Sequence, residues 1–232
     1  MPSADSTSSR LPRILCLHGG GTTGAIFEIQ SHKLRFALRR HFQFTFIDSP
    51  FEGGPGPGVL PVFDGAGPFR RWHCESPENS TLRSIIAERD IVRDFIEGIL
   101  LGAAEGGAPF VGVMAFSQGT RIATGLMVEQ MRSDYRSDIP LLKFAVLLCG
   151  NYPYLPFRGV RVTAPSVHSH GMQDPWLDEG RKLLATCYEA SLATLLEFQG
   201  GHRLPQSRRD VDLLAKAVVN AYKKGSAAEC GG

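Results

Sequence analysis

The chain has 232 residues, of which 43% are hydrophobic and 21% are charged, and its formal charge is +2 at pH 7. This length suits one domain with a sizeable core, and the composition disfavours the disordered, collagen-like and coiled-coil classes. The balanced charge gives no support for nucleic acid or an anionic membrane as the main partner. Composition alone therefore predicts one globular domain and leaves its function open.

The cysteines and the apolar runs bear on the compartment. Five cysteines are an odd number, and they include no C-x-x-C pair, which argues against a complete disulfide framework and a zinc site. No apolar run approaches the ~20 residues needed to span a bilayer. Met1–Arg13 is polar and lacks the apolar centre of a signal peptide. We therefore expect a cytoplasmic protein with no membrane span.

Hydrophobic periodicity predicts an alternation of strands and helices. Between the first two strands, Phe27, Leu34 and Leu38 have helical spacing. The predicted strands are Arg13–Leu17, Phe42–Asp48, Phe110–Phe116, Phe144–Cys149, Ser166–His170 and Ala193–Phe198, and the later predicted helices are Leu82–Leu101, Gln118–Met131, Asp178–Tyr188 and Ser207–Lys223. This alternation predicts a mostly parallel six-stranded α/β sheet with helices on both faces and all carboxyl ends at one edge.

One stretch breaks this rhythm. Pro50–Ser80 is rich in glycine and proline and is too long for an ordinary connection, which predicts a functional loop over the carboxyl edge of the sheet. We expect residues 1–10 to form a disordered tail, 11–224 to form the single domain, and 225–232 to form a flexible tail.

The strongest local motif is Ala115-Phe116-Ser117-Gln118-Gly119, which follows an apolar strand and opens a helix. That context is typical of a nucleophile elbow, in which small residues on both sides of the serine permit a sharp turn. The alternative is a serine that only caps the helix. A catalytic serine needs an imidazole to accept its proton and a carboxylate to orient that imidazole.

Both partners follow later in the chain. Asp174 comes just after the strand that ends at His170, and His202 follows Gly200 and Gly201 after the next strand. The order Ser117, Asp174, His202 is that of the α/β-hydrolase arrangement. His73, in the long loop, is the less favoured alternative to His202 as the base.

Two backbone N–H groups are needed for an oxyanion hole. We expect one from Gln118 and one from Gly20, with Gly19 or Gly21 as alternatives, because the glycine run after His18 lets the backbone approach a substrate oxygen. The same run could form a phosphate loop, although it lacks the Gly-x-Gly-x-x-Gly and Gly-Lys-Ser/Thr patterns. No metal or organic cofactor is required.

Four of these segments resemble the fungal FSH1-type serine hydrolases over roughly Leu11–Tyr222, namely Leu15–Gly21, Ala115–Gly119, Gly171–Pro175 and Gly201–His202. Two further segments, Pro57–Phe63 and Gly67–Trp72, resemble a branch of discrete thioesterases that release chains from polyketide synthases, lovastatin-type release enzymes among them. The resemblance implies an α/β-hydrolase fold, hydrolysis of a carrier-bound acyl thioester, and a triad of Ser117, Asp174 and His202. At Ala115 the family usually has glycine.

Aromatic residues are enriched in the loops at the predicted catalytic edge, which indicates either an apolar acyl pocket or a minor core under the long loop. We expect Phe63, Phe69, Trp72, Tyr152 and Trp176 to bind substrate. Two groups of arginines could receive an acyl carrier protein, because positive patches attract acidic protein surfaces. These groups are Arg70 with Arg71, and Arg35 with Arg39 and Arg40.

Three alternatives accompany the release-enzyme hypothesis. The chain could be a general carboxylesterase, an acyl-protein thioesterase, or a ligand-binding protein that does not turn over. His168 and His170 alternate on one strand, but we expect structural histidines because no further ligand has suitable spacing.

Overall fold

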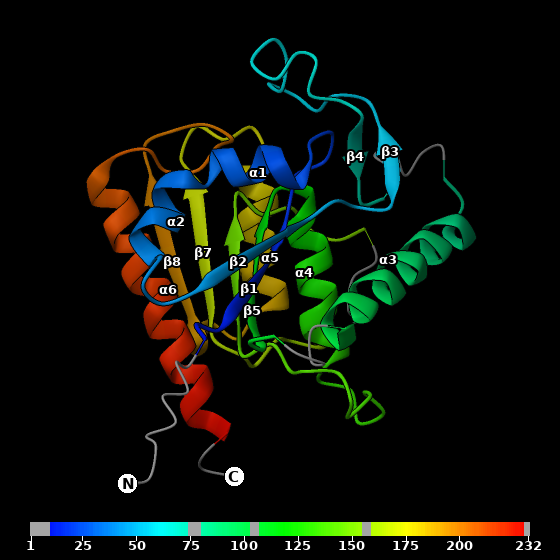
Figure 1. The fold of residues 1–232 in the computed structure, drawn as a ribbon, viewed down its shortest axis with the longest axis vertical. Helices are drawn as coiled ribbons and strands as arrows, with labels where there is room; N and C mark the ends of the chain where they lie inside the picture. Colours follow the sequence, from blue (N-terminus) through cyan, green and yellow to red (C-terminus); the bar gives the residue numbers. More distant parts are fainter. Residues whose placement is uncertain (1–9, 74–79, 103–106, 155–158, 230–232) are drawn as a thin grey trace, which may run out of the picture.

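The computed structural model describes residues 10–73, 80–102, 107–154 and 159–229. Its centre is a parallel six-stranded sheet in the order β2-β1-β5-β6-β7-β8 (Figure 1). The strands are β1 (Arg13–Leu17), β2 (Gln43–Ile47), β5 (Phe110–Phe116), β6 (Phe144–Leu148), β7 (Ser166–Gly171) and β8 (Ala193–Phe198). All six predicted strands are confirmed, and the parallel order puts every carboxyl end at one edge.

Helices cover both faces of the sheet (Figure 1). One face holds α1 (Gly24–Gln30), α2 (His32–Leu38) and α6 (Arg208–Glu229). The other holds α3 (Leu82–Gly102), α4 (Gln118–Glu129) and α5 (Leu177–Cys187). The two-sided α/β architecture is thus confirmed. Within the described residues, no helix is both long and apolar enough to cross a membrane.

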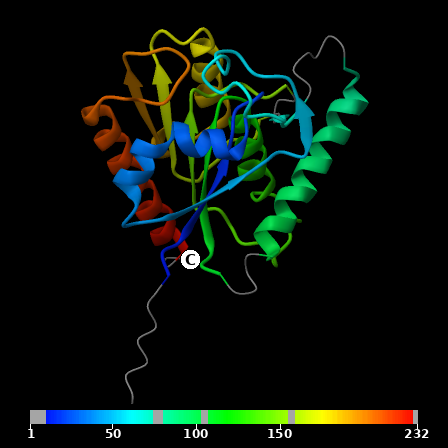
Figure 2. The ribbon, with the colours of Figure 1, turned by 45° about the horizontal axis from the view of Figure 1, so that its top comes forward.

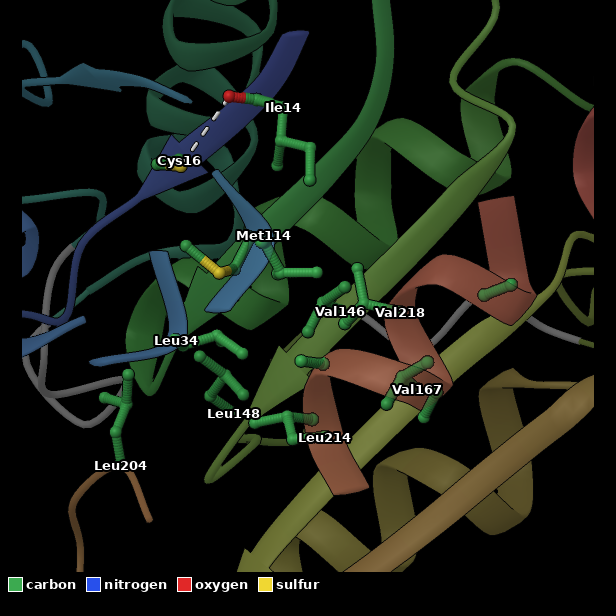
Figure 3. Packing of buried hydrophobic residues seen from close by; sticks show 14 of the residues in the cluster. Ile14, Cys16, Leu34, Met114, Val146, Leu148, Val167, Leu204, Leu214 and Val218 are labelled. Atoms are coloured by element: carbon green, nitrogen blue, oxygen red, sulfur yellow. Dashed lines mark hydrogen bonds between the residues drawn. The ribbon is translucent and has the colours of Figure 1, made fainter. Parts of the chain in front are cut away.

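The two strands at the centre of the sheet, β5 and β6, carry no polar side chain because both of their faces are buried. Along β5, Met114 and Phe116 point into the core beneath α1, α2 and α6, whereas Val113 and Ala115 point into the core beneath α3, α4 and α5. Figure 3 shows the first of these cores, where side chains of β5, β6, α2 and α6 meet. The labelled residues include Leu34, Met114, Val146, Leu148, Leu214 and Val218.

Two helices differ from the predictions. The segment between β1 and β2 is two helices that meet at Ser31, whose hydroxyl donates to the Phe27 carbonyl at 2.8 Å. The last helix continues to Glu229, although a flexible tail was expected from Gly225. Gly225 lies against Lys143, where a Cβ would come within 2.3 Å of the carbonyl oxygen, so this helical turn packs on the chain just before β6. Residues 1–9 and 230–232 of the expected tails lie outside the described residues.

The long loop contains a small hairpin that the sequence did not predict. Strands β3 (Phe51–Gly53) and β4 (Phe69–Arg71) pair antiparallel, and Figure 2 shows the connecting segment near the carboxyl edge of the main sheet. The loop is hydrogen-bonded to the glycine run after β1. Gly21 N donates to Arg70 O at 2.8 Å, and Gly56 N donates to Gly21 O at 3.0 Å. The predicted position over the active-site edge is therefore confirmed.

Candidate active site

Ser117 lies in a sharp turn between β5 and α4. Its φ of 50° and ψ of −120° form a conformation that is unfavourable for a residue with a side chain and is found at strained functional sites. Gly119 has to be glycine, because a Cβ there would come within 2.6 Å of the Leu17 and His18 carbonyl oxygens. Ala115, by contrast, is fully buried between β1 and β6 within the sheet, which accommodates its methyl group.

His202 lies between Ser117 and Asp174. Its Nε2 is 2.8 Å from Ser117 Oγ, and its Nδ1 is 2.8 Å from Asp174 Oδ2. With neutral imidazole, Nδ1–H donates to the carboxylate and Nε2 accepts from the serine hydroxyl, which is the tautomer that a general base requires. The second carboxylate oxygen of Asp174 accepts from Trp176 N at 2.8 Å, which fixes the carboxylate plane.

The loops after β7 and β8 hold Asp174 next to His202. Gln173 N donates to Gly200 O at 2.8 Å, so the two loops are joined by their backbones. Gly171 permits this close approach, since a Cβ there would come within 2.2 Å of Gly201 O. Because Asp174 and His202 each follow one of these glycines closely, the glycines determine how the acid meets the imidazole.

The surroundings of Asp174 favour its ionised form, and those of the neighbouring Cys149 favour its protonated thiol. Burial acts to raise the pKa of Asp174, but hydrogen bonds from His202 and from Trp176 N outweigh it and hold this pKa below its usual value. Burial raises the pKa of the neighbouring Cys149 thiol to about 12. Cys149, Asp174 and His202 are the only group of three potential metal ligands among the described residues. A protonated thiol and an imidazole committed to Ser117 favour proton transfer over metal binding there.

The glycine loop after β1 packs directly on the nucleophile turn. A Cβ on Gly19 would lie 3.4 Å from Ser117 Cβ, and a Cβ on Gly20 would lie 3.0 Å from the Gln118 side chain. The two segments predicted to supply oxyanion donors, Gly20 and Gln118, are therefore adjacent. Gln118 is also the first residue of α4, where the helix dipole favours negative charge.

His18 supports this loop and stays neutral. Its Nδ1 donates to Gly19 O at 2.7 Å, and its Nε2 accepts from Ser49 N at 3.1 Å. Burial lowers the pKa of His18 to about 4. His18 therefore holds the loop backbone and takes no part in the proton relay.

A cavity of about 410 Å³ opens at the serine. Its lining includes Gly20, Val59, Phe116, Ser117, Arg121, Asn151, Tyr154, Trp176, His202 and Arg203. Trp176 is 36% exposed and contacts the His202 ring edge-on, with the ring centroids 4.6 Å apart. Tyr152 lines an adjoining recess. Arg121, Tyr154 and Trp176 line both this recess and the cavity at Ser117.

The other predicted substrate-binding residues lie elsewhere. Trp72 is fully buried and does not line the cavity at Ser117; it borders a small apolar cavity of about 90 Å³ between α3 and α4. Phe63 and Phe69 are half-buried in the long loop and line none of the described cavities. The aromatic residues of the loops indicated an apolar region at the carboxyl edge, but the sequence did not show which way each side chain points.

Sequence reasoning missed Asn151 and Arg121, which both line the cavity at Ser117. Asn151 Oδ1 lies 3.2 Å from Ser117 Oγ and gives the hydroxyl a second acceptor. Its position three residues after β6, at the same edge as the triad, was the available signal. His73 receives a hydrogen bond from Arg121 at 3.3 Å, whereas His202 contacts the serine.

His168 and His170 are buried on β7. Burial lowers the pKa of both, to about 3 for His168, whose Nε2 lies 3.1 Å from Ser166 Oγ. Among the described residues they belong to no group of three potential metal ligands.

The fold and the Ser117–His202–Asp174 network together define a serine hydrolase with the α/β-hydrolase fold. The chain belongs to the FSH1 family: the family model described as "Serine hydrolase (FSH1)" matches residues 8–213.

Curated relatives match nearly the whole chain. Thioesterase FSL2 of Gibberella zeae is 37% identical over 246 residues, covering 95% of this chain and 96% of its own. Esterase mlcF of Penicillium citrinum is 34% identical over 229 residues, covering 91% and 90%.

Solved structures show the same fold. The acyl-protein thioesterase 2 of Zea mays has a TM-score of 0.62 at 19% identity, covering 94% of this chain and 97% of its own. Esterase PE8 has a TM-score of 0.64 at 16% identity, covering 93% and 94%.

Proposed function

We propose that this serine hydrolase is a thioesterase that releases a polyketide or other acyl chain from a synthase carrier protein. The observation that supports hydrolysis most directly is the hydrogen-bonded relay of Ser117, His202 and Asp174 at an open cavity. The similarity to Thioesterase FSL2 favours a thioester over an oxygen ester. General carboxylester hydrolysis is the second candidate, because other relatives are named esterases.

In the proposed acylation step, Ser117 Oγ attacks the thioester carbonyl while His202 Nε2 takes the hydroxyl proton. Asp174 holds the imidazole and stabilises the imidazolium. The N–H groups of Gln118 and Gly20 bind the oxyanion of the tetrahedral intermediate. When the carbon–sulfur bond breaks, His202 returns the proton to the departing thiolate, which leaves an acyl-serine and a free thiol.

Water then completes the reaction. A water molecule in the cavity gives a proton to His202 and attacks the acyl-serine carbonyl, and the same two N–H groups bind the oxyanion again. Collapse expels Ser117 Oγ, which takes the proton from His202, and the free acid leaves. No cofactor takes part in this scheme.

The chemistry suits a thioester because a thiolate, with a pKa of about 8.5 for its conjugate thiol, needs little acid assistance to leave. Trp176, Val59 and Phe116 give the cavity apolar walls for an acyl chain.

An acidic carrier domain is part of the proposal. Arg70 and Arg71 form ion pairs with Glu52 at 3.9 Å and Glu88 at 3.0 Å. Arg39 and Arg40 are exposed beyond the end of α2, and Arg39 packs over Phe36. Of the two predicted arginine groups, the one near α2 therefore presents more uncompensated charge to an acidic partner.

The decisive experiment combines a fluorophosphonate probe with two substrates. We expect stoichiometric labelling of Ser117 and none in Ser117→Ala, together with faster turnover of an acyl thioester on a carrier protein than of a simple aryl ester. Faster aryl ester turnover would favour the general esterase. An unlabelled wild-type serine and no turnover of either substrate would favour a ligand-binding protein.

A further inference from the structure

Arg121 is a positive side chain in the wall of the catalytic cavity. It lies four residues after Ser117, so it follows the nucleophile by about one helical turn, or ~6 Å along the axis of α4, on the same face. A group bonded to the serine in an acyl intermediate is therefore within reach of the guanidinium.

The placement of this arginine is electrostatically unfavourable. It sits in the first turns of α4, where the helix dipole disfavours positive charge, and the first turn contains no acidic residue. No carboxylate among the described residues forms an ion pair with it. Its Nη1 donates to His73 Nε2 at 3.3 Å, its guanidinium stacks over the Tyr154 ring at 3.9 Å, and its buried Nε has no hydrogen-bond partner. These contacts fix the side chain and leave its charge uncompensated.

The charged side chains in the wall of the cavity at Ser117 are all positive. The cavity lining contains Arg121 and Arg203 and, among the described residues, no aspartate or glutamate. Glu179 lines the adjoining recess, where its carboxylate accepts from Tyr152 N at 3.3 Å. Arg203 is exposed, whereas Arg121 is half-buried and held by two aromatic neighbours. A partly desolvated guanidinium binds an anion more strongly than an exposed one does.

We propose that Arg121 binds an anionic group of the substrate, a carboxylate or a phosphate, inside the catalytic cavity. This inference rests on the proposed hydrolysis at Ser117 and narrows its substrate class. The anion can belong to the acyl part, as a carboxylate on the chain, or to the leaving group, as the phosphate of a phosphopantetheine thiol. A planar guanidinium presents two parallel N–H donors, which match either group.

The test compares three thioesters with the wild-type enzyme and with Arg121→Gln. Butyryl-N-acetylcysteamine is neutral, succinyl-N-acetylcysteamine has an acyl carboxylate at similar length, and butyryl-4′-phosphopantetheine has a phosphate on the leaving group. We expect Arg121→Gln to lower kcat/KM for one anionic substrate by about tenfold or more beyond any loss for the neutral one, chiefly through KM. The substrate that suffers identifies the side of the thioester that bears the anion.

Controls separate this proposal from the proposed function and from misfolding. Wild-type labelling by fluorophosphonate and turnover of the neutral thioester test Ser117 without involving Arg121. Arg121→Lys retains the positive charge but not the two parallel N–H donors, and it should recover part of the lost discrimination between anionic and neutral substrates. Arg208→Gln removes a charge from α6 whose side chain is 95% exposed, and it should change none of the three rates. Equal losses on all three substrates, no loss on any, or a selective loss only in Arg203→Gln would overturn the assignment.

Discussion

The backbone N–H of Trp72 donates to Oε1 of Gln118 at 2.7 Å, which joins the long loop to the residue that follows the nucleophile. The indole Nε1 of the same residue donates to His18 O at 2.8 Å. The two bonds reach the two segments proposed to supply the oxyanion donors. Trp72 is therefore a positioning residue that fixes the distance between the glycine loop and the start of α4.

Trp72→Phe should lower both stability and catalytic rate. The change removes the indole N–H and leaves the buried His18 carbonyl without that donor, at a cost of about 1–3 kcal/mol in the free energy of unfolding. We expect kcat to fall more than KM rises, because the oxyanion donors act in the transition state. Urea unfolding and steady-state kinetics measure both. Trp176→Phe, at a partly exposed site, is the matched control and should change stability by less than about 0.5 kcal/mol. Equal stability losses in the two variants would contradict the role of Trp72.

Sequence reasoning located the triad because two physical rules coincide. Continuous apolar runs such as Phe110–Phe116 fit strands buried on both faces, and parallel strands place their following loops at one edge. Ser117, Asp174 and His202 each follow a parallel strand of this sheet, so their meeting was predictable. In the structure the three side chains meet at this edge, with contacts of 2.8 Å from His202 to Ser117 and to Asp174.

Features that depend on contacts across the chain could not be predicted. The three-residue strands β3 and β4 are too short for a period and are supported by bonds to Gly21 and Thr22. Trp72 is buried because the long loop docks on the glycine loop and on Gln118. The aromatic composition of the loop could not show this docking and therefore indicated a residue that lines the substrate pocket. The break at Ser31 depends on one hydroxyl bond to a helix carbonyl, which a 3.6-residue pattern does not reveal.

Asp174→Asn should reduce kcat by up to about 10⁴-fold while the protein remains folded. An asparagine amide can donate to Nδ1 of His202, which favours the tautomer with a proton on Nε2, where the base must accept. Its Oδ1 can still accept from Trp176 N, so the loop keeps its anchor. Esterase kinetics, the fluorophosphonate labelling rate and circular dichroism measure the effect. An Asp174→Asn enzyme with wild-type kcat would exclude Asp174 as the orienting acid.

Gly171→Ala should impair catalysis without altering a triad residue. The new Cβ would lie 2.2 Å from Gly201 O and 2.6 Å from Gly200 O, so the turn that leads to His202 has to move. A displacement of about 1 Å in the base can cost on the order of 10² in kcat. The kcat for an aryl ester is the measurement.

Gly98→Ala is the control for that variant. A Cβ at Gly98, inside α3, would meet no steric obstacle within 4 Å among the described residues, and alanine favours helix over glycine by about 0.5–1 kcal/mol. We expect unchanged kcat and a small gain in stability. Loss of activity in Gly98→Ala, or none in Gly171→Ala, would show that the close approach of the two loops does not set the position of His202.

The buried histidines predict that stability falls on acidification. Burial lowers the folded-state pKa of His18 to about 4 and of His168 to about 3, against about 6.5 for an unfolded chain. Between about pH 6.5 and pH 4 the unfolded state therefore binds more protons than the folded state. Stability is full above pH 6.5 and declines as the pH falls, by up to about 1.4 kcal/mol per pH unit for each histidine.

Urea unfolding of the wild type and of His168→Phe at pH 7, 6 and 5 tests this mechanism. The variant should lose less stability between pH 7 and 5, because one titrating group is gone, although its stability at pH 7 can differ through the contact with Tyr188 and the lost bond to Ser166. The slope against pH, and not the absolute stability, is the decisive quantity. Parallel curves for the two proteins would mean that His168 does not contribute to acid unfolding, since a buried neutral imidazole must take up a proton when the chain unfolds in this range.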